Sequence, residues 1–143
     1  MADYYPPLAF HFRVEFTNIK GEFEFQSVSG LTAERETEQV AEGGENRFKH
    51  QLPGRTRYSN IILKRGLKVN SGLVKWCREA LLDFNIVPTD LTIILLNEEH
   101  EPLQTWNVVH AWPVKWEVSD FNAEENRISV ETIELTYNYF NIQ

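Results

Sequence analysis

Apolar and polar side chains alternate without a break in Phe10-His11-Phe12-Arg13-Val14-Glu15-Phe16. Successive side chains of a β-strand point to opposite faces, so this segment predicts a strand with one buried face and one polar face. The alternation returns in Glu22-Phe23-Glu24-Phe25-Gln26, after a polar turn over residues 18–21. Residues 10–28 are therefore predicted to form a β-hairpin.

A second, longer hairpin is predicted from residue 31 onward. Residues 31–40 are polar and form its first strand, Gly43-Gly44 marks a flexible tip, and residues 47–51 return as a strand that ends at Pro53-Gly54. Thr32 and Thr37 allow the first strand, and its outer face is expected to be charged.

Further strands are predicted toward the C-terminus, over residues 58–64, 91–96, 103–110, 112–118 and 127–139. Residues 91–96 are apolar on both faces, which predicts a strand that is covered on both sides. Pro113 cannot donate a backbone hydrogen bond, so we expect an edge or a bulge at its strand. The apolar positions of the last strand change phase between Val130 and Ile133, which predicts a bulge near Thr132.

One segment changes to a helical period. Its apolar residues, spaced as one face of a helix, are Leu73, Trp76, Cys77, Ala80, Leu81 and Phe84. With Ser71 as N-cap and Pro88 beyond the end, a helix is predicted over about residues 71–84. The fold class predicted is mainly β: a barrel or sandwich of about eight antiparallel strands with one flanking helix.

Composition excludes several classes of protein. The chain has 143 residues, of which 42% are hydrophobic and 24% charged, as in an ordinary globular protein of one domain, 1–143. No segment approaches the ~20 apolar residues of a membrane span, so no membrane anchor is expected. The N-terminal residues lack the pattern of a secretory signal, and the single Cys77 cannot form an internal disulfide, which predicts synthesis in the cytoplasm.

Charge is distributed unevenly along the chain, whose net charge is −7. Residues 46–78 carry basic side chains and no acidic one, whereas Glu34, Glu36 and Glu38 lie just before them. Three interpretations remain open: the two segments pair within one hairpin, the basic segment binds nucleic acid, or an acidic face of one copy meets a basic face of the next. No nucleic-acid-binding motif is present, so sequence-specific nucleic-acid binding is not expected.

No pattern of catalytic or metal-binding residues is present. The histidines His11, His50, His100 and His110 lack the spacing of a zinc site, and no phosphate loop or nucleophile elbow occurs. Cys77 lies on the apolar face of the helix, where a buried structural thiol is the expected role. We therefore expect no enzyme activity, no cofactor and no metal.

Several short motifs, in this order, resemble the inner-tube proteins of contractile injection systems, the phage tail tube family. They are Phe10-His11-Phe12-Arg13-Val14, Val28-Ser29-Gly30-Leu31, Leu52-Pro53-Gly54, residues 59–66, Trp106 followed by Ala111-Trp112-Pro113, and the late stretch over residues 121–135. The turn over residues 97–102 and the Ala111-Trp112-Pro113 run are most similar to the branch that forms extracellular phage-tail-like particles.

This resemblance implies a structural subunit whose hexameric rings stack into a hollow tube, which conducts cargo when a sheath contracts. The implied partners are further copies of the chain, a sheath protein, baseplate and spike proteins, and a protein cargo in the lumen. The particle would assemble in the cytoplasm, and release from the cell is compatible with it.

The resemblance also suggests which residues make contacts between copies. The predicted inter-ring contacts, at the tip of the long hairpin, are Glu42, Gly43, Gly44, Glu45, Asn46, Arg47, Phe48 and Lys49. The predicted intersubunit charges are Glu34, Glu36, Glu38, Arg55, Arg57, Lys64 and Arg65. Two alternatives to a repeating tube subunit stay open: a tube-initiating subunit at the baseplate, and, in a different class, a small-ligand-binding β-barrel.

Overall fold

The computed structural model describes residues 10–40, 44, 50–66, 72–119 and 129–143. The strands are β1 (His11–Phe16), β2 (Glu22–Phe25), β3 (Ser27–Ser29), β4 (Ala33–Val40), β5 (His50–Tyr58), β6 (Ile61–Gly66), β7 (Thr89–Leu96), β8 (Pro102–Val118), β9 (Val130–Thr136) and β10 (Tyr139–Ile142). The helix is α1 (Gly72–Leu81).

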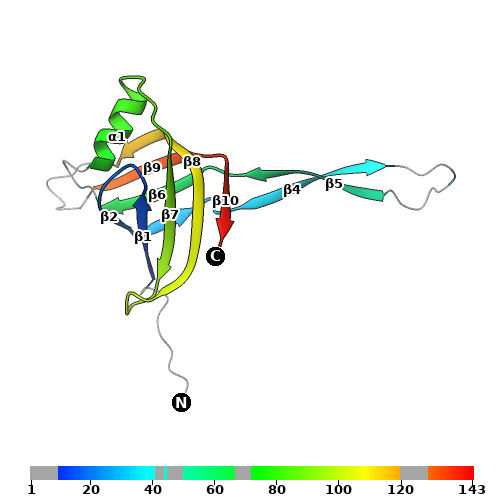
Figure 1. Cartoon of the computed structure of the whole chain (residues 1–143), viewed down its shortest axis with the longest axis horizontal. Coiled ribbons are helices and arrows are strands. Elements are labelled where there is room, and N and C mark those ends of the chain that lie inside the picture. Colours follow the sequence, from blue (N-terminus) through cyan, green and yellow to red (C-terminus); the bar gives the residue numbers. More distant parts are fainter. Residues whose placement is uncertain (1–9, 41–43, 45–49, 67–71, 120–128) are drawn as a thin grey trace, which may run out of the picture.

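Eight of these strands form one antiparallel sheet that curls into a barrel (Figure 1). The order is β2-β1-β7-β8-β9-β6-β3, and β10 pairs with β8 beside this path. The two ends of the path, β2 and β3, are consecutive in the chain, and between them the Gln26 amide donates to the Lys64 carbonyl at 2.9 Å. The predicted mainly-β barrel with one flanking helix is confirmed.

A single bent strand, β8, replaces two strands that the sequence predicted separately. Its first half pairs with β7 and its second half with β9, and the register with β7 shifts between Thr89 and Leu91. At the bend His110 has a φ of 60°, and its amide donates to the Asp90 carboxylate at 2.9 Å. A second shift between Pro113 and Lys115 confirms the bulge expected at Pro113.

The bulge predicted near Thr132 is wrong. The register of β9 with β6 is unbroken from Leu135 to Val130. Glu131 is fully buried and faces the core on the same side as Ile133 and Leu135. The phase of the strand is therefore constant, and the apparent change arose because a glutamate occupies a core position.

The predicted hairpin boundaries needed two corrections. β1 and β2 form the first hairpin, but β3 leaves it and pairs with β6. β5 runs through Pro53 and Gly54 instead of ending there. Proline is tolerated at this position because β5 belongs to a two-stranded ribbon, where a missing donor on an open edge costs little.

Helix α1 packs against β8 on the outside of the barrel (Figure 1). Leu73, Trp76, Cys77 and Ala80 are buried, as the helical spacing predicts. The helix ends at Leu81, earlier than predicted, and Phe84 is 87% exposed with a φ of 56°. Helices commonly end near a residue in the left-handed conformation, and Phe84 is such a residue just beyond Leu81. The expected N-cap, Ser71, lies outside the described residues.

The barrel interior is filled by side chains. The fully buried apolar residues include Val14, Ile61, Leu63, Ile93, Ile133 and Leu135. In the described residues these side chains pack into one core cluster, as in small barrels whose interior is just wide enough for side chains to fill. β7 contributes buried side chains from both faces, Ile93 and Ile94, as expected for a strand covered on both sides.

Candidate assembly surfaces

A two-stranded ribbon, β4 and β5, projects from the barrel as a long arm (Figure 1). All eight residues of β4 are exposed, and in β5 only Gly54 and Tyr58 are partly covered. A lone two-stranded ribbon is at best marginally stable in water, because it buries almost no apolar surface. The arm is therefore the part of the described structure that would gain most from a partner.

Charged side chains of the arm pair across its two strands. Glu34 lies opposite Arg57 in the register, and the Nε of Arg57 is 3.6 Å from a carboxylate oxygen of Glu36. Arg35 donates from Nη1 to the Gly54 carbonyl oxygen at 3.0 Å. The first interpretation of the uneven charge, pairing within one hairpin, is thus confirmed for these residues.

This internal pairing leaves the charges available to a neighbour. The side chains of Arg57 and Glu36 are 69% and 48% exposed. An exposed ion pair of this kind contributes about 0–1 kcal/mol, so exchanging it for a contact with another molecule costs little. Glu34, Glu38 and Arg55 are also exposed.

The remaining predicted contact residues divide into three groups. Gly44 is exposed with a φ of 89°. The other residues of the predicted tip lie outside the described residues: Glu42, Gly43, Glu45, Asn46, Arg47, Phe48 and Lys49. Lys64 is exposed on β6. Arg65 is only 2% exposed and lies in the core, so its assignment as a surface charge is wrong. The alternation of β6 turns Arg65 inward together with Ile61 and Leu63.

An apolar groove beside the helix is a surface that sequence reasoning missed. A cavity of about 440 Å³ lies between α1 and β8, and its lining residues are Val74, Cys77, Arg78, Leu81, Leu82, Lys115 and Trp116. Leu82 and Phe84, just beyond the helix, are 77% and 87% exposed. Clustered exposed apolar side chains are typical of protein-interaction surfaces. The signal in the sequence was the excess of apolar residues after the helix.

Cys77, at the base of this groove, is suited to packing and not to nucleophilic chemistry. It is 1% exposed. Burial and, secondarily, the Glu131 carboxylate raise the pKa of the thiol to about 12, against the opposing influence of Arg65. The thiolate is the reactive form, so a thiol that is both buried and raised in pKa is inert. The expectation of a structural thiol agrees with this environment.

Comparison with known proteins gives one family. The sequence profile of the T4-like virus tail tube protein gp19 matches residues 8–141. No curated protein sequence matches the chain significantly. In the part of the chain that the structure describes, no helix has the length and apolar character needed to cross a membrane.

Several solved structures share the fold, among them a chain of an extracellular contractile injection system. A chain of the cryo-EM structure of the anti-feeding prophage baseplate is 31% identical with a TM-score of 0.80, and the match covers 100% of this chain and 97% of that one. A chain of the sheath-tube complex of the extracellular contractile injection system PVC, in the extended state, is 30% identical with a TM-score of 0.78, over 99% and 93%. Hcp1 from Salmonella typhimurium shares the fold at 14% identity and a TM-score of 0.60, over 92% and 84%. The higher identities belong to the extracellular particles, as the resemblance of the motifs suggested.

Proposed function

Because this chain belongs to the family of T4-like virus tail tube proteins, we propose that it is the repeating subunit of the inner tube of a contractile injection system. In this proposal hexameric rings of the chain stack into a hollow tube, and contraction of a surrounding sheath drives the tube and its cargo into a target. The role is structural and not catalytic.

The observation that carries this proposal is the exposed arm formed by β4 and β5. A ribbon with so little buried surface is expected to find its stabilising contacts on another molecule. The arm carries Glu34, Glu36 and Glu38 on one strand and Arg55 and Arg57 on the other. When it lies against the next ring, these charges set the register of stacking more than they add affinity.

In stacking of this kind, one surface of a copy meets a different surface of the next copy. A head-to-tail contact that does not close on itself continues as an open filament. In the proposal the tip of the arm, residues 42–49, reaches the adjacent ring, and Lys64 lies among the charges that the neighbouring arm meets. Arg65 takes no part, because it is enclosed in the core.

Closure of each ring requires a second surface, and the strand β10 offers one. Among the described strands β10 pairs with β8 only, and its residues Tyr139 and Ile142 are 43% and 63% exposed. An open strand edge is a template for pairing with another chain. We propose that strands of neighbouring copies meet along such edges and form a continuous wall around the lumen.

The similar structures indicate the partners. One relative belongs to a sheath-tube complex and another to a baseplate, so we propose sheath, baseplate and spike proteins as partners of this chain, with a protein cargo in the lumen. The apolar groove between α1 and β8 is on the outside of the barrel, where a sheath would reach it. Assembly would take place in the cytoplasm before any release of the particle.

A tube-initiating subunit at the baseplate is the second candidate, favoured by the match to a chain of the anti-feeding prophage baseplate. The identity to that chain is 31% and to the sheath-tube chain 30%, so the two roles are almost equally similar. Quantitative mass spectrometry of intact particles distinguishes them, because a repeating subunit is present in many more copies than an initiator.

Electron microscopy of charge-reversed variants tests the stacking proposal. We expect the purified wild-type protein to form rings and stacked tubes, and the double variant Arg47→Glu/Lys49→Glu to form rings that do not stack. The matched control, Lys20→Glu/Lys75→Glu, changes the net charge equally at exposed positions away from the arm and should leave tube length unchanged. Tubes of normal length in the first variant would refute the assignment of the tip, and a wild-type protein that stays monomeric in all buffers would refute the proposed function.

A further inference from the structure

Two histidines and a glutamate that are distant in the sequence meet at one end of the barrel. They are His11 on β1, Glu24 on β2 and His100 in the turn between β7 and β8. One potential ligand atom from each lies within 4.8 Å of the other two. We propose that these three side chains bind a divalent transition-metal ion, with Zn²⁺ as the best fit. This inference is independent of the proposed assembly into tubes.

The hairpin of β1 and β2 places the first two ligands on one face. Glu24 lies opposite Arg13 in the register, and His11 is two residues from Arg13 on the same strand. Side chains two apart on a strand share a face, so His11 and Glu24 are diagonal neighbours within reach of each other. This is the polar side of the strands whose other side holds Val14 and Phe23 in the core.

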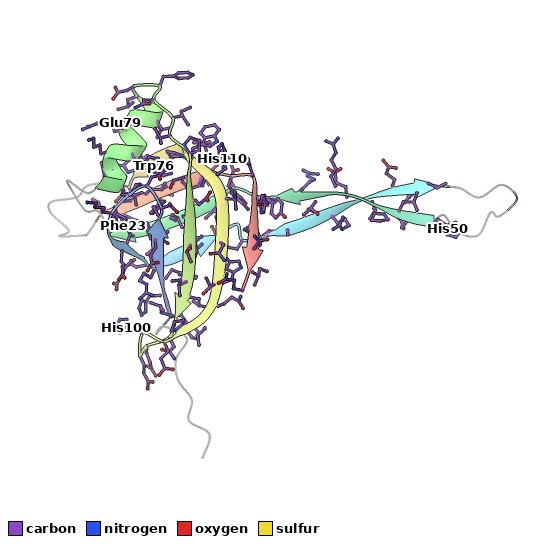
Figure 2. All side chains as sticks on the ribbon, in the orientation of Figure 1. Phe23, His50, Trp76, Glu79, His100 and His110 are labelled. Carbon is purple, nitrogen blue, oxygen red and sulfur yellow. The ribbon has the colours of Figure 1, made fainter. Side chains whose placement is uncertain are left out.

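The third ligand is held in place by an ordered turn. Asn97 Oδ1 accepts hydrogen bonds from the amides of Glu99 and Glu101, both at 2.9 Å. His100 adopts a φ of 61°, and its own amide donates to the Asn97 carbonyl at 3.0 Å. Figure 2 shows His100 at the end of the barrel opposite α1, on the β7–β8 turn. The turn thus directs the imidazole of His100 toward β1.

The distances suit a tetrahedral metal ion. Nε2 of His11 and Nδ1 of His100 are 3.0 Å apart, in an edge-on arrangement with an interplanar angle of 76°. Zinc bonds of about 2.0–2.1 Å to nitrogen place tetrahedral ligand atoms about 3.3 Å apart. The two nitrogens therefore need only a small separation to admit the ion, and Glu24 closes in as the third ligand.

The donor set selects the class of metal. Two imidazole nitrogens and one carboxylate suit Zn²⁺ and its first-row neighbours, whereas Mg²⁺ and Ca²⁺ prefer oxygen ligands. A fourth position stays open to water, because Glu24 and His100 are exposed and His11 is half-buried. A bound ion would link the β1–β2 hairpin to the β7–β8 turn and stabilise the folded state by mass action.

Metal titration of the full-length protein, after removal of metals with a chelator, tests the proposal. We expect isothermal titration with Zn²⁺ to show one site per chain, Mg²⁺ to show none, and the melting temperature to rise with Zn²⁺. His100→Asn removes the ligand while asparagine tolerates the left-handed backbone. The matched control is His110→Asn, since His110 has nearly the same φ of 60° and lies elsewhere on β8.

We expect His110→Asn to bind Zn²⁺ with the affinity of the wild type. His100→Asn and Glu24→Gln should bind Zn²⁺ about tenfold or more weakly, and their melting temperatures in the absence of metal should equal that of the wild type. Should His100→Asn fail to fold, Glu24→Gln gives the same comparison without touching the turn. The proposal is overturned by a wild-type protein without stoichiometric binding, or by equal affinity in the wild type and the ligand variants.

Discussion

Arg65 and Glu131 lie directly opposite each other on β6 and β9, and the guanidinium Nε is 3.0 Å from the carboxylate Oε2 inside the barrel. The two side chains are 2% and 0% exposed. The indole of Trp116 donates to the other oxygen of Glu131 at 2.9 Å, and the guanidinium lies 5.2 Å from the ring centre of Phe25. Removing two charges from water is costly, so each depends on the other and on these neighbours.

Breaking this ion pair should destabilise the protein more than replacing it. Glu131→Gln removes the carboxylate that pairs with the buried Arg65 guanidinium, and we expect a loss of about 3–5 kcal/mol in the free energy of unfolding. The double variant Arg65→Met/Glu131→Leu should lose less than either single change, because no charge is left in the core. Urea denaturation measures the loss of stability in the single and double variants. A loss in the double variant equal to the sum of the losses in the single variants would contradict the coupling.

The thiol of Cys77 should make the protein sensitive to alkali. Its pKa rises from 9.0 to about 12 on folding, chiefly through burial. The folded state therefore holds the proton more tightly than the unfolded state, so the contribution to stability is complete below pH 9 and declines as the pH rises toward 12. When the midpoint of urea unfolding is followed from pH 9 upward, it should fall less steeply for Cys77→Ala than for the wild type. Equal slopes would show that the Cys77 thiol is not the cause of the decline.

Trp76 anchors α1 to the barrel. Its side chain is 7% exposed, its indole donates to the Val87 carbonyl at 2.8 Å, and its ring packs 5.5 Å from that of Phe16. Trp76→Ala should cost about 3–5 kcal/mol through the cavity it leaves. Phe84→Ala is the control, since an exposed residue usually changes stability by about 0.5 kcal/mol or less. Thermal unfolding of the two variants compares them, and equal melting temperatures would contradict the packing of the helix.

Gly30 allows two strands to approach each other closely. It has a φ of 87°, and a Cβ there would lie 1.9 Å from the Asn60 carbonyl oxygen. Gly44 has a similar φ of 89°, and no atom of the described residues lies within 4 Å of its Cβ position. Gly44→Ala should cost about 1–2 kcal/mol from backbone strain alone, and Gly30→Ala clearly more. Equal losses in chemical denaturation would show that the chain relaxes around the clash.

Local patterns were sufficient for much of the fold. The alternation in β1 and β2, the helical spacing of Leu73, Trp76 and Cys77, and the bulge at Pro113 all depend on neighbouring residues only. The patterns failed where a distant partner changed the meaning of a residue. The phase change predicted in the last strand left Glu131 out of its apolar face, because nothing near it in sequence indicates that Arg65 and Trp116 meet it in the core.

The candidate surfaces divide in the same way. The acidic and basic segments of the arm are visible in the sequence because they are contiguous, and their pairing in β4 and β5 follows from a hairpin. The His11–Glu24–His100 cluster and the groove between α1 and β8 were not predicted. The members of each come from separate elements, and only the strand order and the turn at Asn97 bring them together.

By itself, then, the amino-acid sequence determined the strands, the helix and the family, because periodicity and short motifs are properties of adjacent residues. The tertiary structure alone decided that Arg65 and Glu131 are core residues, that β8 is one bent strand, and that His11, Glu24 and His100 lie close together. Those outcomes depend on which strands become neighbours. The strand pairing of the native state is the one with the lowest free energy for the whole chain, and it cannot be derived from the preferences of one segment.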